Sequence, residues 1–321
     1  MSKILILSDL GIKIGLGHYA RAKILNRDIK KILNNKKDLY NLYVSDKKYS
    51  FTKTIRKNNI YKILNEYIEF KGIKKIVFNV SRFLEPYLYD IIVKIKKRHK
   101  KVNLYAIDGF INKQNFFRKI WIPNVALKNS SAKYGNKKNI IYGWDKIIIG
   151  KKVFKKKINV IKKILILIGG TDKYNIGKKL PKLLCAKFKN IKFIWVKGPF
   201  AKTPIKGNCK NLVVIKNKLN LNKIYSQADY AFVVFGVTFF EVLNNKIPHV
   251  LFFHKKKKID LHLISSLKKL KFNVSNDCND ALNKLKKLTE NELKSKKQVY
   301  KLSKYLNFNK RNKVIKNFLE I

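Results

Sequence analysis

The chain has 321 residues with a hydrophobic fraction of 46%, which is ordinary for a globular protein and enough for two domains. Its 74 lysine and arginine residues against 19 aspartate and glutamate residues give a formal net charge of +55. The sequence has no run of about 18 apolar residues that would mark a membrane span, so we expect a soluble chain.

The basic residues point to one of two interpretations, a polyanion-binding protein or biased codon usage. Only seven of them are arginine, and the lysines are spread along the whole chain. Nucleic-acid surfaces more often use arginine forks. We therefore expect no specific nucleic-acid partner, but weak, salt-sensitive attraction to polyanions and to an anionic membrane surface.

The compartment is predicted from the first residues and from the cysteines. Asp9 interrupts the first apolar run and no cleavage pattern follows, so we expect a cytoplasmic protein, and we expect it to be a monomer. Cys185, Cys209 and Cys278 contain no CxxC pair and leave an odd thiol in any disulfide scheme. We expect all three to be reduced, small apolar side chains.

Short apolar runs alternate with amphipathic, lysine-faced stretches along the chain. In the first half the predicted strands are 4–7, 40–44, 75–80 and 103–107, and the predicted helices are 18–33 and 87–98. In the second half the predicted strands are 164–168, 191–196, 212–214, 230–234 and 249–253, and the predicted helix is 176–188. Strands between helices predict parallel sheets, so the fold class is α/β with two doubly wound, Rossmann-like domains.

The lysine-rich stretch 149–163 is the predicted join, which gives domains of 1–155 and 156–321. A long polar helical stretch at 292–318 ends the chain, and we expect it to pack back across both domains.

The first candidate site follows the first strand, in the sequence SDLGIKIGLGHYARAK. Gly15 and Gly17 allow a positive φ and close approach of a ligand. His18 falls at the start of the helix, where the helix dipole favours a neutral ring that can accept a proton. Arg21 lies one turn later and could face an anion. The alternative is a simple glycine turn with an incidental histidine.

The second candidate site is the sequence ILILIGGTDKYNIG, in which a buried strand ends at Gly169 and Gly170 before a helix. Backbone N–H groups at such a turn suit a diphosphate. The alternative is a tight strand–helix turn with Asp172 or Asn175 as helix cap.

The third candidate site begins after the strand 230–234, at Gly236. Thr238 and Glu241 have the spacing of a capping box, which needs no function. A carboxylate in the first helical turn could also accept both hydroxyls of a ribose.

Together these motifs resemble the UDP-2,4-diacetamido-2,4,6-trideoxy-β-L-altropyranose hydrolases of the pseudaminic-acid route, which are related to the MurG-like glycosyltransferases. The resemblance covers about residues 1–270. The matching segments are Asp9 with the GxGHxxR stretch, Gly169–Asp172, the strand-plus-GP step at Gly198, the Ala106-Ile107-Asp108 stretch, the AD-x-A strand at 228–231, and Gly236 with Thr238 and Glu241.

The resemblance implies a GT-B fold with a UDP-sugar in a cleft between the domains. It implies that His18 is a general base that activates water, so that UDP leaves the anomeric carbon with inversion. It assigns substrate binding to Asp9, Gly15, Gly17, Arg21, Gly169, Gly170, Thr171, Asp172, Gly198, Gly236, Thr238 and Glu241. No cofactor and no metal is implied.

The sequence departs from the family at several positions. Phe235 and Val237 replace a glycine and a serine, the stretch 79–82 replaces an Asp-His-Tyr region, and Asp260 with His262 stands near an expected Asn-Gln pair. These departures bear on the sugar and on the acceptor. A GT-B glycosyltransferase, a non-catalytic nucleotide-sugar binding protein and a charge-driven polyanion binder are therefore the alternative functions.

Overall fold

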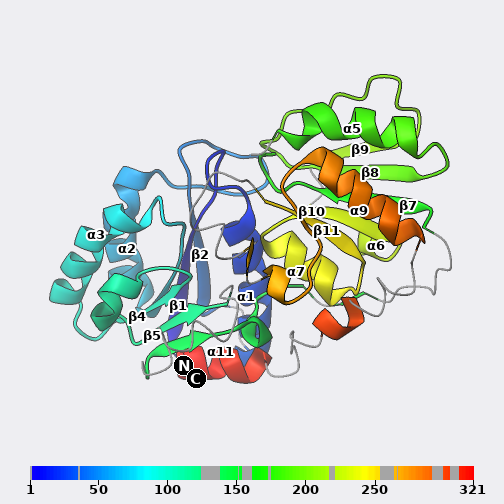
Figure 1. Ribbon diagram of the computed structural model, residues 1–321. Coiled ribbons are helices and arrows are strands. Elements are labelled where there is room, and N and C mark those ends of the chain that lie inside the picture. The colour runs from blue at the N-terminus through cyan, green and yellow to red at the C-terminus, as the bar shows by residue number, and fades with distance from the viewer. Residues whose placement is uncertain are drawn as a thin grey trace. The chain divides into compact units, whose positions relative to one another are not determined.

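The computed structural model describes residues 2–34, 37–123, 138–150, 152–153, 161–172, 175–216, 221–253, 264–265, 267–290, 299–303 and 311–321. The chain forms two compact units. Unit 1 comprises Met1–Ile148 and Leu306–Ile321, and unit 2 comprises Ile149–Tyr305. Each unit is drawn in Figure 1 with its own sheet. The division falls at Ile149 rather than at 156, and the end of the chain belongs to unit 1.

The described strands of unit 1 form a six-stranded parallel sheet in the order β2-β1-β3-β4-β5-β6. The strands are β1 (Lys3–Asp9), β2 (Leu39–Val44), β3 (Ile73–Asn79), β4 (Asn103–Ile107), β5 (Lys119–Ile122) and β6 (Ile140–Tyr142). The α-helices are α1 (Gly17–Leu33), α2 (Ile60–Lys71), α3 (Glu85–Arg98) and α11 (Arg311–Leu319), and the 3-10 helices are η1 (Lys57–Asn59), η2 (Ile111–Phe116) and η4 (Trp144–Lys146).

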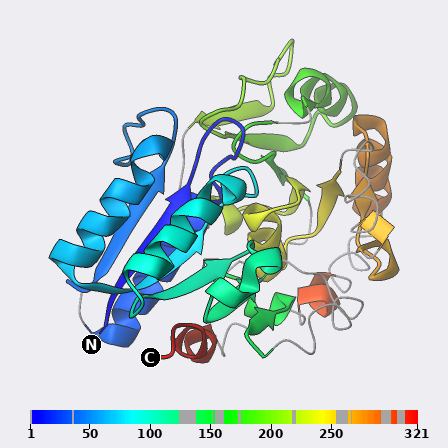
Figure 2. The same cartoon turned by 90° about the vertical axis from the view of Figure 1, so that its left-hand side faces the viewer.

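Helices cover both faces of this sheet, which is why β1 is apolar at nearly every position. Ile4 and Ile6 pack against apolar residues of α1 and α11, whereas Leu5 and Leu7 pack against those of α2 and α3. In Figure 2 the light-blue and teal helices α2 and α3 lie in front of the strands.

The C-terminal helix α11 is held on unit 1 by polar contacts as well as by its apolar face. The buried ammonium of Lys75 donates to the carbonyl of Leu319 at 2.5 Å, and burial lowers the pKa of this lysine. Arg311 Nε lies 2.9 Å from Asp28 Oδ2, an ion pair with both side chains largely buried.

The described strands of unit 2 form a parallel sheet in the order β12-β11-β10-β7-β8-β9. Its strands are β7 (Lys163–Leu167), β8 (Lys192–Lys197), β9 (Leu212–Lys216), β10 (Tyr230–Val234), β11 (His249–Phe252) and β12 (Val274–Ser275). The helices are α5 (Ile176–Lys187), α6 (Asn222–Tyr225), α7 (Val237–Asn244) and α9 (Cys278–Glu290). Taken from β7, this is the strand order typical of the Rossmann fold.

The expectation of three reduced cysteines is wrong for two of them. Cys185 of α5 and Cys209 form a disulfide, with their Cα atoms 5.4 Å apart. Cys278 is free and half-buried. The loop between β8 and β9 folds back onto α5, and the spacing of the cysteines along the chain could not show this return.

Candidate functional site

His18 lies in the first turn of α1, beside the carboxyl end of β1. Its Nδ1 is 2.6 Å from Oδ1 of Asp9, the last residue of that strand. Asp9 is 1% exposed, and the His18 side chain is 18% exposed. A carboxylate that receives Nδ1–H fixes the ring orientation and leaves the Nε2 lone pair free to accept a proton. The structure therefore brings together the predicted residues Asp9 and His18.

Two residues of the stretch 79–82, which departs from the family's pattern, complete this arrangement. Ser81, just after β3, donates its backbone N–H and its hydroxyl to Asp9 at 3.0 and 2.5 Å. Asn79, the last residue of β3, donates from Nδ2 to Ser8 Oγ at 2.9 Å and to the His18 carbonyl at 2.8 Å. Asn79 and Ser81 thus hold the carboxylate and the first turn of α1.

The position of this group follows from the strand order. The chain runs from β1 to β2 on one side and then returns to β3 on the other side of β1. In open α/β sheets ligands bind at such a switch point, at the carboxyl ends of the strands. Asp9, Asn79 and Ser81 lie at this point, so the topology places them where a ligand is expected.

Arg21 does not present a free guanidinium to a ligand. Its Nη1 lies 3.0 Å from Oδ2 of Asp108, the residue after β4, and its side chain is 7% exposed. Arg21 Nε has no hydrogen-bond partner among the described residues. Asp108 belongs to the Ala106-Ile107-Asp108 stretch, so two predicted motifs meet inside unit 1. The anion that Arg21 faces in the structure is the carboxylate of Asp108.

Gly15 and Gly17 shape the loop before His18. Gly15 has a φ of +83° and accepts and donates backbone hydrogen bonds with Gly11. Gly17 is the first residue of α1, which has no side-chain cap at its N-terminus.

In unit 2 the glycine pair lies at the equivalent switch point. The chain runs from β7 to β8 and β9 and then returns to β10 on the other side of β7. Gly169 follows β7 with a φ of +77°, and an added Cβ there would lie 3.5 Å from Val234 at the end of β10. Gly236 follows β10, and an added Cβ there would meet open space.

Gly198 supports the glycine pair from β8. A Cβ at Gly198 would lie 2.4 Å from the Gly169 carbonyl oxygen and 2.5 Å from Gly170 Cα. Phe200 also donates its N–H to the Gly170 carbonyl at 2.9 Å. Close packing of the two loops therefore accounts for a glycine at position 198. This explanation does not depend on the proposed contact between Gly198 and the substrate.

Asp172 acts as the cap of α5, the alternative considered for it. Its two carboxylate oxygens accept the N–H groups of Ile176 and Gly177 at 3.0 and 2.9 Å. Burial raises the pKa of Asp172, and these two hydrogen bonds oppose the rise. Because the first N–H groups of α5 are already bound, this helix end offers fewer donors to a diphosphate than the sequence suggested.

The capping box at Thr238 and Glu241 is not formed. Helix α7 begins at Val237, Gly236 is its N-cap residue, and no side chain caps it. Glu241 instead accepts a hydrogen bond from the Tyr225 hydroxyl at 2.7 Å and one from the backbone of Gly150. Burial raises the pKa of Glu241, and the two hydrogen bonds lower it. The uncapped end of α7 is thus the better-suited anion site of unit 2.

The aromatic substitution at Phe235 has a clear packing role. Its ring lies 5.4 Å from Phe239, 5.6 Å from Phe240 and 5.7 Å from Phe253, measured between centroids. Thr171 is half-buried at the start of the turn after Gly170. Asp260 and His262 lie outside the described residues.

Two further properties concern the described residues alone. No three His, Cys, Asp or Glu side chains among them group as ligands for a metal ion. None of their helices is long and apolar enough to cross a membrane.

No family model and no curated protein matches the chain, but solved structures do. MurG of Acinetobacter baumannii is 13% identical, with 99% of this chain and 100% of that chain covered and a TM-score of 0.59. The glycosyltransferase of kitacinnamycin is 9% identical over 99% and 100% of the chains, with a TM-score of 0.64. CalG4, the calicheamicin glycosyltransferase, is 10% identical over 99% and 98%, with a TM-score of 0.58.

These similarities extend over both units and confirm the predicted fold class. The chain has the α/β GT-B fold of two Rossmann-like domains. The narrower resemblance to the altropyranose hydrolases remains a prediction.

Proposed function

We propose that this protein is an enzyme that releases UDP from a UDP-activated sugar, with water as the nucleophile. The observation that carries the proposal is the hydrogen-bonded series Ser81–Asp9–His18 at the switch point of unit 1. Nε2 of His18 accepts the proton of water as it attacks the anomeric carbon, and the C1–O bond to UDP breaks with its electrons on the diphosphate.

Unit 2 supplies the proposed nucleotide site. The uncapped first turn of α7, with Gly236 before it, and the Gly169–Gly170 turn present backbone groups at one switch point. Their N–H groups and the helix dipole would stabilise the charge that develops on the leaving diphosphate. Glu241 retains lone pairs on its two oxygens for ribose hydroxyls beyond its bonds to Tyr225 and Gly150. In this proposal Asp9 orients His18, and Arg21, Asp172 and Gly198 shape the binding loops.

A glycosyltransferase using the same UDP-sugar is the second candidate, and one surface feature favours it. Ile12 and Phe83 are 53% and 69% exposed, and Lys13 and Arg82 beside them are exposed as well. These four residues, the apolar–basic patch, follow the adjacent strands β1 and β3. Exposed apolar side chains with basic neighbours suit an anionic membrane surface that carries an acceptor.

One experiment separates these functions. The protein is incubated with a panel of UDP-sugars, and free UDP is measured without and with a lipid or saccharide acceptor. Release without an acceptor supports hydrolysis, and release only with an acceptor supports transfer. UDP binding without UDP release, both with and without an acceptor, would support a nucleotide-sugar binding protein. The absence of any affinity for UDP would contradict the hydrolase, the glycosyltransferase and the binding protein alike.

A further inference from the structure

A hollow on unit 1 lies near the carboxyl ends of the strands, the edge of the sheet where Asp9 and Ser81 also lie. None of the residues of the proposed catalytic and nucleotide sites lines it. It has a volume of about 380 Å³ and is lined by Asp46, Arg56, Lys57, Asn58 and Tyr87. Small-molecule sites in proteins are typically about 300–1,000 Å³ in volume. The hollow is therefore large enough for an organic ligand and not only for a few water molecules.

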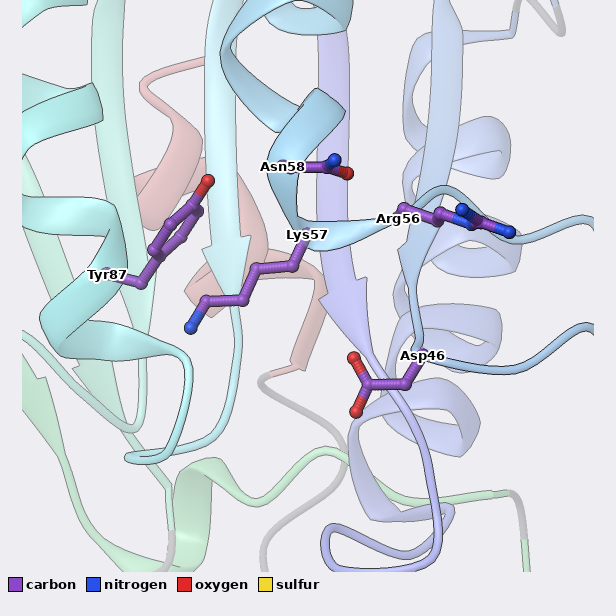
Figure 3. Close-up of a pocket in the computed structure, with 5 residues that line it drawn as sticks. All are labelled: Asp46, Arg56, Lys57, Asn58 and Tyr87. Carbon is purple, nitrogen blue, oxygen red and sulfur yellow. The ribbon is translucent and has the colours of Figure 1, made fainter.

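The lining residues come from segments that the fold brings together. Asp46 follows β2, whose last residue Val44 pairs in register with Asp9. Lys57 and Asn58 form η1 before α2, and Tyr87 lies in the first turn of α3. Figure 3 shows Lys57 extending alongside Tyr87 and Asp46 entering from the end of β2, whereas Arg56 extends toward the other side.

Arg56, Lys57 and Asp46 bring two positive charges and one negative charge to the lining of the hollow. Neither Asp46 nor Lys57 forms an ion pair with another residue of the described ranges. Lys57 Nζ lies 4.2 Å from the centroid of the Tyr87 ring, a cation–π contact that holds the ammonium beside the ring. Tyr87 is 37% exposed. A carboxylate, an ammonium and an exposed aromatic ring therefore share one hollow.

We propose that this hollow is a second binding site, for a neutral saccharide unit. The carboxylate of Asp46 can accept hydrogen bonds from sugar hydroxyls, and Lys57 and Asn58 can donate to them. One face of the Tyr87 ring carries the Lys57 ammonium, and the exposed remainder of the ring offers an apolar surface for a sugar ring, with a polar hydroxyl at its edge. Asp46 places a negative charge in the same hollow as Arg56 and Lys57, so the lining is of mixed charge and suits a neutral, hydroxyl-rich ligand.

A neutral ligand also makes a clean test, because a chain with a net charge of +55 attracts anions without any built site. N-acetylglucosamine and glucose are titrated separately into the full chain, and binding is followed by saturation-transfer difference NMR. Binding is measured without turnover, so its outcome is independent of the proposed function. We expect a Kd of about 1 mM for one or both sugars, which corresponds to a modest binding site.

The variants Asp46→Asn and Tyr87→Ala are each expected to weaken binding about tenfold, because each removes one recognising group from a weak site. Both residues are exposed, so their replacement leaves the fold intact, which circular dichroism verifies. Lys62→Gln, an exposed lysine of α2 outside the hollow, is the matched control and should bind like the wild type.

Two results would overturn the proposal. One is no transfer signal from either sugar at concentrations about twentyfold above the expected Kd. The other is sugar binding that Asp46→Asn and Tyr87→Ala leave unchanged, which would place the sugar elsewhere on the chain.

Discussion

The contact between Gly198 and the glycine pair gives a prediction that is independent of catalysis. In Gly198→Ala the new methyl group would lie 2.4 Å from the Gly169 carbonyl oxygen and 2.6 Å from the Gly170 carbonyl carbon. Both atoms belong to the backbone, so no side chain can turn away to make room. Overpacking costs about 1–3 kcal/mol, and we expect the upper end because two backbone segments must separate. For a unit of this size that corresponds to a fall in Tm of about 6–12 °C.

The assay is thermal unfolding followed by circular dichroism, with UDP affinity measured by calorimetry on the same samples. Gly150→Ala is the control, because its new methyl group would lie 3.6 Å from Glu241 Oε1, an ordinary contact. The control should change the free energy of unfolding by no more than about 0.5 kcal/mol. UDP should bind Gly198→Ala more weakly than the control. A Tm for Gly198→Ala equal to that of the control would refute the close packing described for this loop.

Three more predictions follow from polar groups and from the disulfide. Burial lowers the pKa of His249 from 6.5 to about 4, so its neutral form stabilises the fold above pH 6.5 and this contribution is lost as the pH falls toward 4. In urea titrations the free energy of unfolding of the wild type should fall by about 3 kcal/mol between pH 6.5 and pH 4, and His249→Phe should lack this contribution. An equal dependence of the unfolding free energy on pH in both proteins would contradict the burial of His249. Ser81→Ala should shift His18 toward a mixture of tautomers in ¹⁵N NMR and slow UDP release about tenfold, because a charge-assisted hydrogen bond to Asp9 is lost. An unchanged tautomer signal would show that the Ser81 hydroxyl does not position the ring. Reducing the Cys185–Cys209 disulfide, which joins residues 24 positions apart, should cost about 3 kcal/mol of stability in unit 2, and a Tm insensitive to reductant would argue against the bond.

Much of the fold was predictable because parallel sheets leave a strong pattern in the sequence. The strands at 103–107 and 230–234 have the predicted bounds, since each is a short apolar run, with Asp108 directly after the first and Gly236 shortly after the second. Helix α2 was missed although its buried Ile60 and Leu64 have helical spacing, and β6 was missed because it has only three residues. Within the long helix predicted at 292–318, the structure describes residues 299–303 and 311–318, and α11 runs from Arg311 to Leu319, one residue beyond the predicted end.

The candidate site was predictable only in part, because sequence spacing shows neighbours along a strand but not across strands. Asp9 and His18 are nine positions apart on one strand–helix connection, so their motif could be recognised. Ser81 is 72 residues from Asp9, and only the β1–β3 pairing brings it to the carboxylate. The signal that could have found it is a serine directly after a predicted buried strand, at the sheet edge where ligands bind.

The same reasoning explains where the motifs misled. Thr238 and Glu241 have the spacing of a capping box, but α7 begins at Val237, which places Glu241 in the second turn beside Tyr225. Arg21 was expected to meet an external anion, but its partner Asp108 lies 87 residues away at the end of β4. In both cases a buried polar group takes a tertiary partner that the local sequence does not show.

The most direct test of the account compares the wild type with His18→Ala in two measurements, the Kd for UDP and the rate of acceptor-free UDP release from a UDP-sugar substrate. General-base catalysis contributes about 10²–10⁴-fold to a rate. The variant should therefore have the same Kd for UDP as the wild type, but it should cleave UDP from the UDP-sugar at least about a hundredfold more slowly. Equal release rates in the two proteins would contradict the role of His18 and, with it, the proposed reaction.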